Sequence, residues 1–323
     1  MTEIFSVFLL ILLVITAGAA IRTTNLFVAV MLMGIFSLLI AINFFLLDAA
    51  DVALTEAAVG AGISTVLFLG ALAFMNEQER EQAPKRLAGL ISVSITGLII
   101  AYATFDKPAF GDPNAPAHQD LAPWFLETTQ SAVDIPNVIT AILGSFRGYD
   151  TLGEVFVVLT AAIGVLFLLD TPSAGNMLKR DEGLRHYLIP RMVGRLLIPF
   201  ILLFGLYVQF HGEYGPGGGF QAGALVAASM ILYALLEGQD RALEVLPQRV
   251  LTFLMVFGAL LYGGVGVVGI LQGSNFLDYS VLSSDPVAGQ QLGIILIEAG
   301  VGFTVTGVLL SIFHAFVARG RTQ

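Results

Sequence analysis

Three glutamates lie within long apolar stretches of the sequence: Glu56, Glu154 and Glu298. An uncompensated charge in hydrocarbon costs about 3 kcal/mol or more, so an acid in such a stretch is a hypothesis for a functional site. Burial favours the protonated form and would permit proton exchange, whereas a neighbouring cation would make the carboxylate an ion ligand. We interpret all three as proton or cation relays. The alternative is structural: Glu56 could cap or hydrogen-bond the start of its helix beside Asp48 and Asp51, Glu154 lies at a similar depth at the start of its span, and Glu298 could be a buried acid bonded to Ser or Thr.

A run of three glycines, Gly217 to Gly219, lies in HGEYGPGGGF. A phosphate-binding loop would need a preceding strand and a Lys-Ser/Thr pair, and the sequence has neither here. Two interpretations are open. The run could make a tight reversal with close helix packing, because glycine permits a positive φ. It could also begin a helix whose free N–H groups face an anion or the carboxylate of a partner.

The composition identifies the elements that must position these groups. The chain has 323 residues, of which 56% are hydrophobic and 12% charged, whereas soluble domains carry about 25% charged residues. Stretches long enough to cross the bilayer as helices recur along its length. We predict an all-α integral membrane protein with nine spans, at about 4–21, 26–47, 52–75, 87–105, 152–169, 192–210, 219–236, 250–272 and 290–316.

The basic residues predict the orientation of these spans. With nine spans, all but two of the 15 Lys and Arg residues fall on one side, and only Lys107 and Arg147 fall on the other. The positive-inside rule then places the N-terminus outside and the C-terminus in the cytoplasm. The long outer connection, 106–150, is expected to contain a short interfacial helix near Trp124 and a half-helix or re-entrant piece within 135–149. The inner connection 170–191 is the expected domain boundary.

Several function classes are disfavoured. The chain has no cysteine and only four isolated histidines, so we expect no metal site and no bound cofactor. A net charge of −9 argues against a nucleic-acid partner. No nucleophile and base are paired in the sequence, so we expect a transporter subunit or scaffold rather than an enzyme.

The segment RMVGRLLIPFILLFGLYVQFHGEYGPGGGFQAGALVAASMILYAL resembles the B-type subunit of the Mrp-type multisubunit cation/proton antiporters. The loop of that family has the form H-x-x-P-G-G-G-F, which is matched here by His211, Pro216, Gly217, Gly218, Gly219 and Phe220. The stretch LIEAGVGFTVTGVLL is similar to the last helix of the family, and Glu298 stands where the family usually has aspartate.

The first half resembles other parts of the same complexes. Residues 26–74 are similar to the C-terminal domain of the large A-type subunit, which also occurs as the separate D-type subunit of membrane-bound hydrogenases. Asp51, Thr55 and Glu56 match its A-P-D-V-A-L-T-E motif, with Ala50 in place of proline. The stretch from 137 to 165 resembles the following E-type domain, with matches at Asn137, Val138, Arg147, Gly148, Asp150, Thr151, Gly153 and Glu154.

The resemblance implies three domains, at 1–76, 85–171 and 185–318, in a membrane subunit that exchanges Na⁺ for H⁺ and serves pH homeostasis in the inner membrane. It implies as partners the large A-type and D-type proton-translocating subunits, the small C-, E-, F- and G-type subunits, and lipid. Thr55, Asp51, Arg147, Asp150 and the His211 to Phe220 motif would support the relay residues or assembly. The alternatives are the equivalent subunit of a hydrogenase-type or other redox-driven pump, or a scaffold that does not transport.

Overall fold

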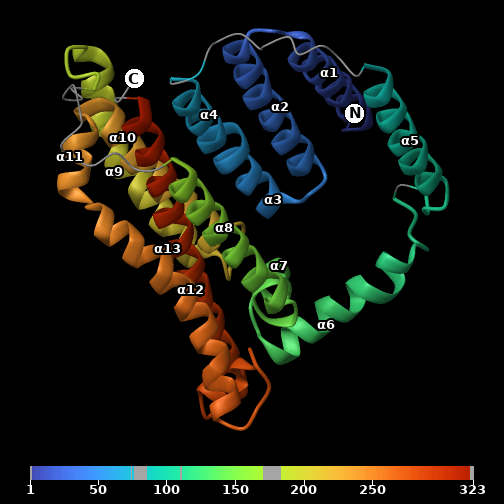
Figure 1. The fold of residues 1–323 in the computed structure, drawn as a ribbon. Helices are drawn as coiled ribbons and strands as arrows, with labels where there is room; N and C mark the ends of the chain where they lie inside the picture. Colours follow the sequence, from blue (N-terminus) through green and yellow to red (C-terminus); the bar gives the residue numbers. More distant parts are fainter. Residues whose placement is uncertain (1, 74, 76–85, 110, 170–182, 321–323) are drawn as a thin grey trace.

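A computed structural model describes residues 2–73, 75, 86–109, 111–169 and 183–320. Within these residues the chain is helical, and its long elements run up and down in sequence order (Figure 1). They are α1 (Thr2–Arg22), α2 (Leu26–Leu46), α3 (Ala50–Thr55), α4 (Ser64–Leu72), α5 (Arg86–Phe105), α6 (Ala122–Ala132), α7 (Val138–Ala141), α8 (Gly148–Leu169), α9 (Leu188–His211), α10 (Gly219–Glu237), α11 (Gln239–Val245), α12 (Gln248–Leu271) and α13 (Pro286–Gly320).

The prediction of nine spans is confirmed within the described residues. Nine helical segments there are long and apolar enough to cross a membrane. The third is composite, because α3 continues through a π-helical segment, η1 (Glu56–Ile63), into α4. The last is the longest, with 35 residues.

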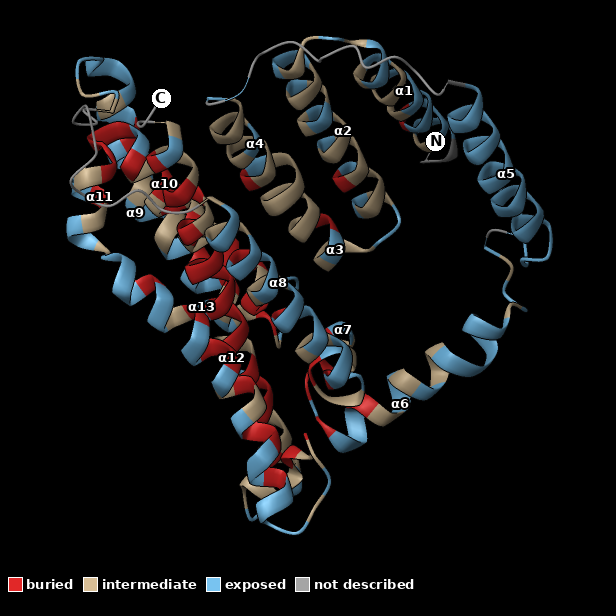
Figure 2. Cartoon of the chain, in the orientation of Figure 1, coloured by how far each residue is buried: buried red, intermediate tan, exposed pale blue. Residues whose placement is uncertain are grey.

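Helix α13 forms the centre of the C-terminal half. It packs against α8, α10 and α12, and Figure 2 shows the buried residues concentrated on these helices. Small residues allow the helices to approach closely. At Gly258 in α12, an added Cβ would overlap the carbonyl oxygen of Gly300 in α13. The side chains on the facing sides of α8, α10, α12 and α13 are therefore held by closely packed helices.

The N-terminal helices lie beside this bundle. The α3–η1–α4 span contacts α2 on one side, and its η1 and α4 parts contact α10 and α13 respectively. Helix α5 is different, because every one of its described side chains is exposed (Figure 2). Such an apolar helix must be covered by lipid or by another protein chain.

The long connection between α5 and α8 contains both predicted helical pieces. A π-turn, η2 (Ala117–Leu121), leads into α6, which carries Trp124. The centroid of the Trp124 ring lies 4.9 Å from that of the Phe125 ring and 5.5 Å from that of the Phe146 ring. The expected half-helix is α7, continued by a π-helical turn, η3 (Ile142–Phe146), which packs on α13 and α8.

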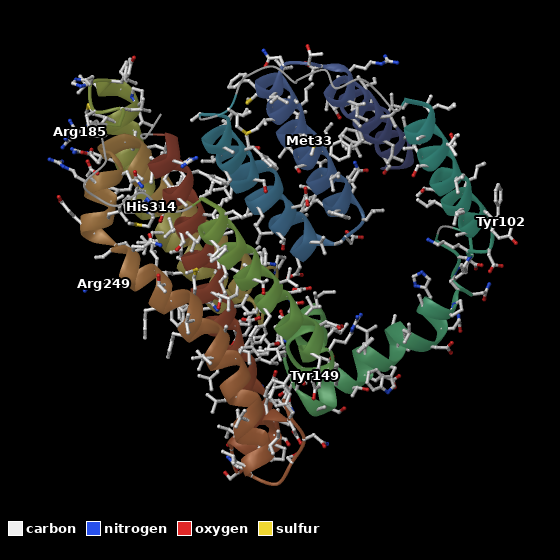
Figure 3. All side chains as sticks on the ribbon, viewed as in Figure 1. Met33, Tyr102, Tyr149, Arg185, Arg249 and His314 are labelled. Atoms are coloured by element: carbon white, nitrogen blue, oxygen red, sulfur yellow. The ribbon has the colours of Figure 1, made fainter. Side chains whose placement is uncertain are left out.

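The described ends are arranged as the alternating spans require. Arg185 lies at the end of the bundle that holds the C-terminus, and Tyr149 lies nearer the opposite end (Figure 1 and Figure 3). The direction in which these ends face the membrane stays a prediction. Arg80, Lys85, Lys179, Arg180 and Arg321 lie outside the described residues, as do positions 76, 85 and 171 at the predicted domain boundaries.

Candidate functional site

Three segments distant in sequence meet at the side chain of Asn137. Asn137 is buried and begins α7, where its Oδ1 accepts a hydrogen bond from the N–H of Ile139. Its Nδ2 donates to the carbonyl oxygens of Gly212 (3.0 Å) and Gly215 (2.9 Å) and to Oδ1 of Asp51 (3.2 Å). One amide therefore joins the α9–α10 loop to the start of α3.

Asp51 accepts hydrogen bonds from two of these segments. Besides the bond from Asn137, its Oδ1 accepts the backbone N–H of Gly217 at 3.2 Å. Its own carbonyl accepts the hydroxyl of Thr55 at 2.9 Å. The structure thus brings the predicted supporting residues Asp51 and Thr55 to the glycine loop.

The glycine loop makes the tight reversal of the first interpretation. It reverses the chain between α9 and α10, and Gly218, with φ of 123° and ψ of 176°, has a backbone conformation that is essentially restricted to glycine. Helix α10 begins at Gly219, and the Gly217 N–H before it faces the Asp51 carboxylate. Because this carboxylate belongs to the same chain and the N–H precedes the helix, the bond is not the partner contact of the second interpretation, which stays a prediction.

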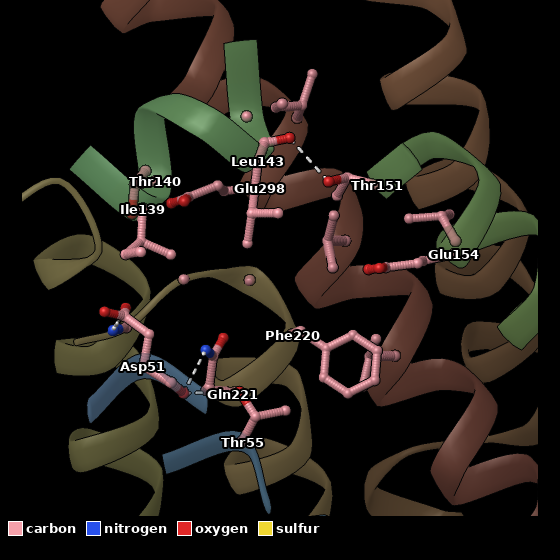
Figure 4. Close-up of a pocket in the computed structure, with 18 of the residues that line it drawn as sticks. Asp51, Thr55, Ile139, Thr140, Leu143, Thr151, Glu154, Phe220, Gln221 and Glu298 are labelled. Carbon is pink, nitrogen blue, oxygen red and sulfur yellow. Dashed lines mark hydrogen bonds between the residues drawn. The ribbon is translucent and has the colours of Figure 1, made fainter. Parts of the chain in front are cut away.

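A cavity of about 520 Å³ adjoins this junction. Asp51, Glu154 and Glu298 line it together with Thr55, Thr140, Thr151 and Gln221, and the three carboxylates surround one space (Figure 4). Of the described residues that line it, none is Lys, Arg or His. The lining is mainly apolar, and its carboxylates have no cation beside them, an arrangement that favours proton binding.

Two of the three predicted relay residues face this cavity from different helices. Glu298 projects from the middle of α13 and is partly buried, and an added Cβ at Gly218 would lie 3.3 Å from its Oε1. Glu154 projects from the second turn of α8 and is exposed. The cavity therefore extends from the packed centre of the bundle, at Glu298, to the surface of the chain, at Glu154.

Glu56 is placed elsewhere. It begins η1, and it is absent from the residues that line the cavity. A Cβ added at Gly60 would overlap its Oε1 and would lie 2.8 Å from the Ser37 hydroxyl of α2. The Glu56 carboxylate therefore points to the interface between η1 and α2, although Thr55 beside it lines the cavity.

Other predicted supporting residues also lie outside the cavity lining. Arg147 and Asp150 form an exposed ion pair at 2.6 Å, one turn apart on the surface. His211 ends α9 with its ring against Tyr207, at 4.7 Å between ring centroids. Phe220, by contrast, lines the cavity just after the glycine run.

Two further carboxylates were missed by the sequence analysis. Glu237, the last residue of α10, is 2% exposed and accepts hydrogen bonds from Arg185, Arg191, Arg195 and Arg241, at distances from 2.7 to 3.4 Å. The Arg-rich segment before α9 was a signal that a buried acid lay nearby. Glu213, within the glycine loop, has a buried Oε1 for which the described residues supply no hydrogen bond.

Comparison with known protein families matches the chain in three consecutive parts. Residues 11–77 match the family of the MBH D-type subunit, and residues 87–175 match that of the MBH E-type subunit. Residues 189–311 match the domain related to the MnhB subunit of Na⁺/H⁺ antiporters. The segments that meet at Asn137 thus lie in parts of the chain that match three different subunit families.

Two curated relatives and two solved structures are similar to the chain. The antiporter protein mnhB2 of Staphylococcus aureus is 34% identical over 38% of this chain and 88% of its own length. The A/B-type subunit of the K⁺/H⁺ antiporter of Rhizobium meliloti is 26% identical over 91% of this chain, which spans 33% of that relative. The Mrp complex of Dietzia sp. DQ12-45-1b shares the fold, with a TM-score of 0.76 and 24% identity over 96% of this chain and 34% of that one. A chain of the membrane-bound sulfane sulfur reductase, an archaeal respiratory complex, has a TM-score of 0.56 and 26% identity over 72% of this chain and 98% of that one.

The helical fold and these matches define a class, the multi-pass subunits of multisubunit membrane complexes. Within that class, the chain belongs to the family of MnhB-type antiporter subunits, through its C-terminal domain. Ahead of that domain it carries parts related to the D-type and E-type subunits of MBH, which agrees with the predicted fusion of a B-type subunit to A-like C-terminal domains.

Proposed function

We propose that the chain is a membrane subunit of a multisubunit antiporter that exchanges Na⁺ for H⁺ across the inner membrane, and that it lends carboxylates to the ion path. The observation that carries the proposal is the cavity shared by Asp51, Glu154 and Glu298, with no basic residue among its described lining. A carboxylate that no cation neutralises can take up and release protons or hold a cation. Family membership supports the same role.

The partners that fit this role are the large A-type and D-type subunits and the small C-, E-, F- and G-type subunits. None of the predicted spans of this chain contains an internal lysine, so the lysine-dependent part of proton translocation belongs to other chains. The exposed helix α5 and the exposed mouth of the cavity at Glu154 offer surfaces where such subunits and lipid would pack. Glu56 is proposed as a relay on a separate route between η1 and α2.

The experiment is proton exchange in membrane vesicles that contain the complete complex. Glu154→Gln and Glu298→Gln keep size and hydrogen bonding but remove titration, so both complexes should assemble and lose most Na⁺-dependent proton exchange. Glu154→Asp should retain part of the exchange with a shifted pH optimum. The matched control is Glu127→Gln, because Glu127 is exposed on α6 and lies outside the cavity lining. If both Gln variants assemble in normal amounts and exchange protons as wild type does, the proposed role in the ion path fails and the chain is a scaffold that does not transport.

A redox-driven pump is the second candidate, and the similarity to the D-type and E-type subunits of MBH and to a respiratory complex favours it. This chain would use the same carboxylates in either setting. Copurification of the complex with identification of every subunit separates the two: antiporter subunits alone support the first, and electron-transfer subunits support the second.

A further inference from the structure

A second cavity, of about 490 Å³, lies on the other side of Glu298. It is formed by α9, α10, α12 and α13, and its lining is mainly apolar. The polar side chains in that lining are Gln209, Glu213, Glu298 and Thr306. Glu298 lines both cavities, so its carboxylate lies in the wall between them.

The glycine loop is what leaves room for this carboxylate. A Cβ at Gly212 would lie 3.2 Å from its Oε2, and a Cβ at Gly218 would lie 3.3 Å from its Oε1. A Cβ at Gly219 would overlap the carbonyl oxygen of Glu298 itself. Both carboxylate oxygens of Glu298 therefore lie against glycine backbone. A larger side chain at Gly212 or Gly218 would crowd the carboxylate.

Glu213 is the second acid of the new cavity. Its carbonyl oxygen accepts the N–H of Asn137 at 2.9 Å, which fixes its backbone to the junction described above. Its Oε1 is buried without a hydrogen bond from the described residues, and burial raises the pKa of this carboxyl above its usual range. A buried carboxylate oxygen left in this state calls for a proton, a water molecule or a cation.

The charged groups that act on Glu298 are all acidic. They are Asp51 at the start of α3 and Glu213 in the loop, whose negative charges repel a negative charge on Glu298. Glu154 of α8 is a third acid, which lines the first cavity with Glu298. Neither cavity has a Lys, Arg or His among its described lining residues. Carboxylates arranged in this way are favoured when they share protons, because like charges otherwise repel.

We propose that Glu213 and Glu298 form a proton-transfer pair that connects the second cavity with the first. A protonated Glu213 gives its proton, directly or through water, to the ionised Glu298, so that one O–H bond breaks, one forms and the pair keeps its charge. Glu298 then passes the proton to the first cavity, toward Asp51 and Glu154. This pair rests on the proposed function, and it adds a route that begins outside the first cavity.

The first test measures Na⁺-dependent proton exchange across a range of pH in vesicles with the complete complex. Glu213→Gln should lower exchange by roughly a hundredfold or more, the scale expected when a positioned proton-transfer group is removed. Glu213→Asp should restore part of the rate with a shifted pH profile, which a purely structural residue would not do. Glu127→Gln is the matched control, because Glu127 lines neither cavity, and it should leave both the rate and the profile unchanged.

The outcomes distinguish the pair from the underlying function. If Glu154→Gln and Glu298→Gln abolish exchange while Glu213→Gln keeps the wild-type profile, the pair is overturned and the proposed function stands. If all three variants behave as wild type, the proposed function itself fails.

A second test needs no variant to assemble. Dicyclohexylcarbodiimide is apolar and adds to protonated carboxyl groups, so it should enter the apolar second cavity of the wild-type complex and label Glu213 or Glu298. Peptide mass spectrometry should show this labelling falling as the pH rises, while the exposed Glu127 stays unlabelled. Labelling of Glu213 and Glu298 no greater than that of Glu127 at every pH would overturn the pair.

Discussion

The backbone N–H of Gly217 donates to Oδ1 of Asp51 across 3.2 Å, and this bond joins residues 166 positions apart. The same oxygen accepts Nδ2 of Asn137 at 3.2 Å. Parts related to three different subunits are therefore held together at one carboxylate oxygen. Because the first cavity adjoins this junction, its shape depends on how these parts are docked.

Asn137→Leu should destabilise this junction. The change removes the donor to the carbonyl of Gly215, and a buried acceptor left without a partner costs roughly 1–3 kcal/mol. Gly212 keeps the hydroxyl of Thr140 as a donor and Asp51 keeps the N–H of Gly217, so these two acceptors lose less. We expect a lower yield of intact complex and a lower Tm in detergent. The control is Asn114→Leu, at an exposed position of the α5–α6 connection, which should assemble normally. An Asn137→Leu complex with wild-type Tm would show that the junction does not depend on this amide.

Gly218→Val should reduce assembly, because its φ of 123° would impose roughly 1–3 kcal/mol of strain on a residue with a side chain. The added Cβ would also lie 3.3 Å from the Glu298 carboxylate. The measurement is the amount of complex recovered by affinity purification. Gly264→Ala is the matched control, because a Cβ there meets nothing within 4 Å. Normal assembly and transport in Gly218→Val would make the run an ordinary loop.

Glu237→Gln should destabilise the end of α10. The carboxylate is 2% exposed and interacts with four arginines, so its neutralisation leaves guanidinium groups facing one another. We expect a loss of about 2 kcal/mol, because these arginines are partly exposed and water screens their repulsion. The comparison is Asp150→Asn in the exposed pair with Arg147, which should change stability by less than about 1 kcal/mol. Equal effects of the two variants on Tm would contradict the prediction.

Asp278, in the connection between α12 and α13, should make this region sensitive to acid. The hydroxyls of Ser274 and Ser280 hold the pKa of its carboxyl below the usual range. A carboxyl whose pKa is lowered by folding contributes stability above its unfolded pKa, and this contribution is lost as the pH falls through the folded pKa. Asp278→Asn should therefore lower the Tm at neutral pH, and the difference from wild type should shrink in acid. A difference that is constant with pH would exclude this cause.

The orientation of the chain is open to direct measurement. A reporter fused after Gln323 should be cytoplasmic, and one inserted near Asn114 should be external, because all but two of the basic residues fall on one side of the nine spans. Cysteine accessibility to an impermeant reagent is a suitable readout, since the native chain has no cysteine. Both sites on the same side of the membrane would rule out the orientation.

The sequence by itself determined the membrane class, the number of spans and the family. These follow from local properties: the length of apolar stretches, the distribution of Lys and Arg, and motifs such as HGEYGPGGGF. It also marked Glu154 and Glu298 as acids in apolar surroundings, because the cost of a charge in lipid depends on a short window of sequence.

Only the tertiary structure decided which of these acids share a space. Glu56 and Glu154 look alike in sequence, yet Glu154 lines the first cavity and Glu56 faces α2, because the direction of a side chain depends on how its helix is rotated against its neighbours. Glu237 and Glu213 do not stand within an apolar stretch: the arginines of residues 185–195 indicate a buried acid without saying which one, and Glu213 lies in a loop. Their burial comes from helices distant in sequence, and a linear pattern does not carry that information.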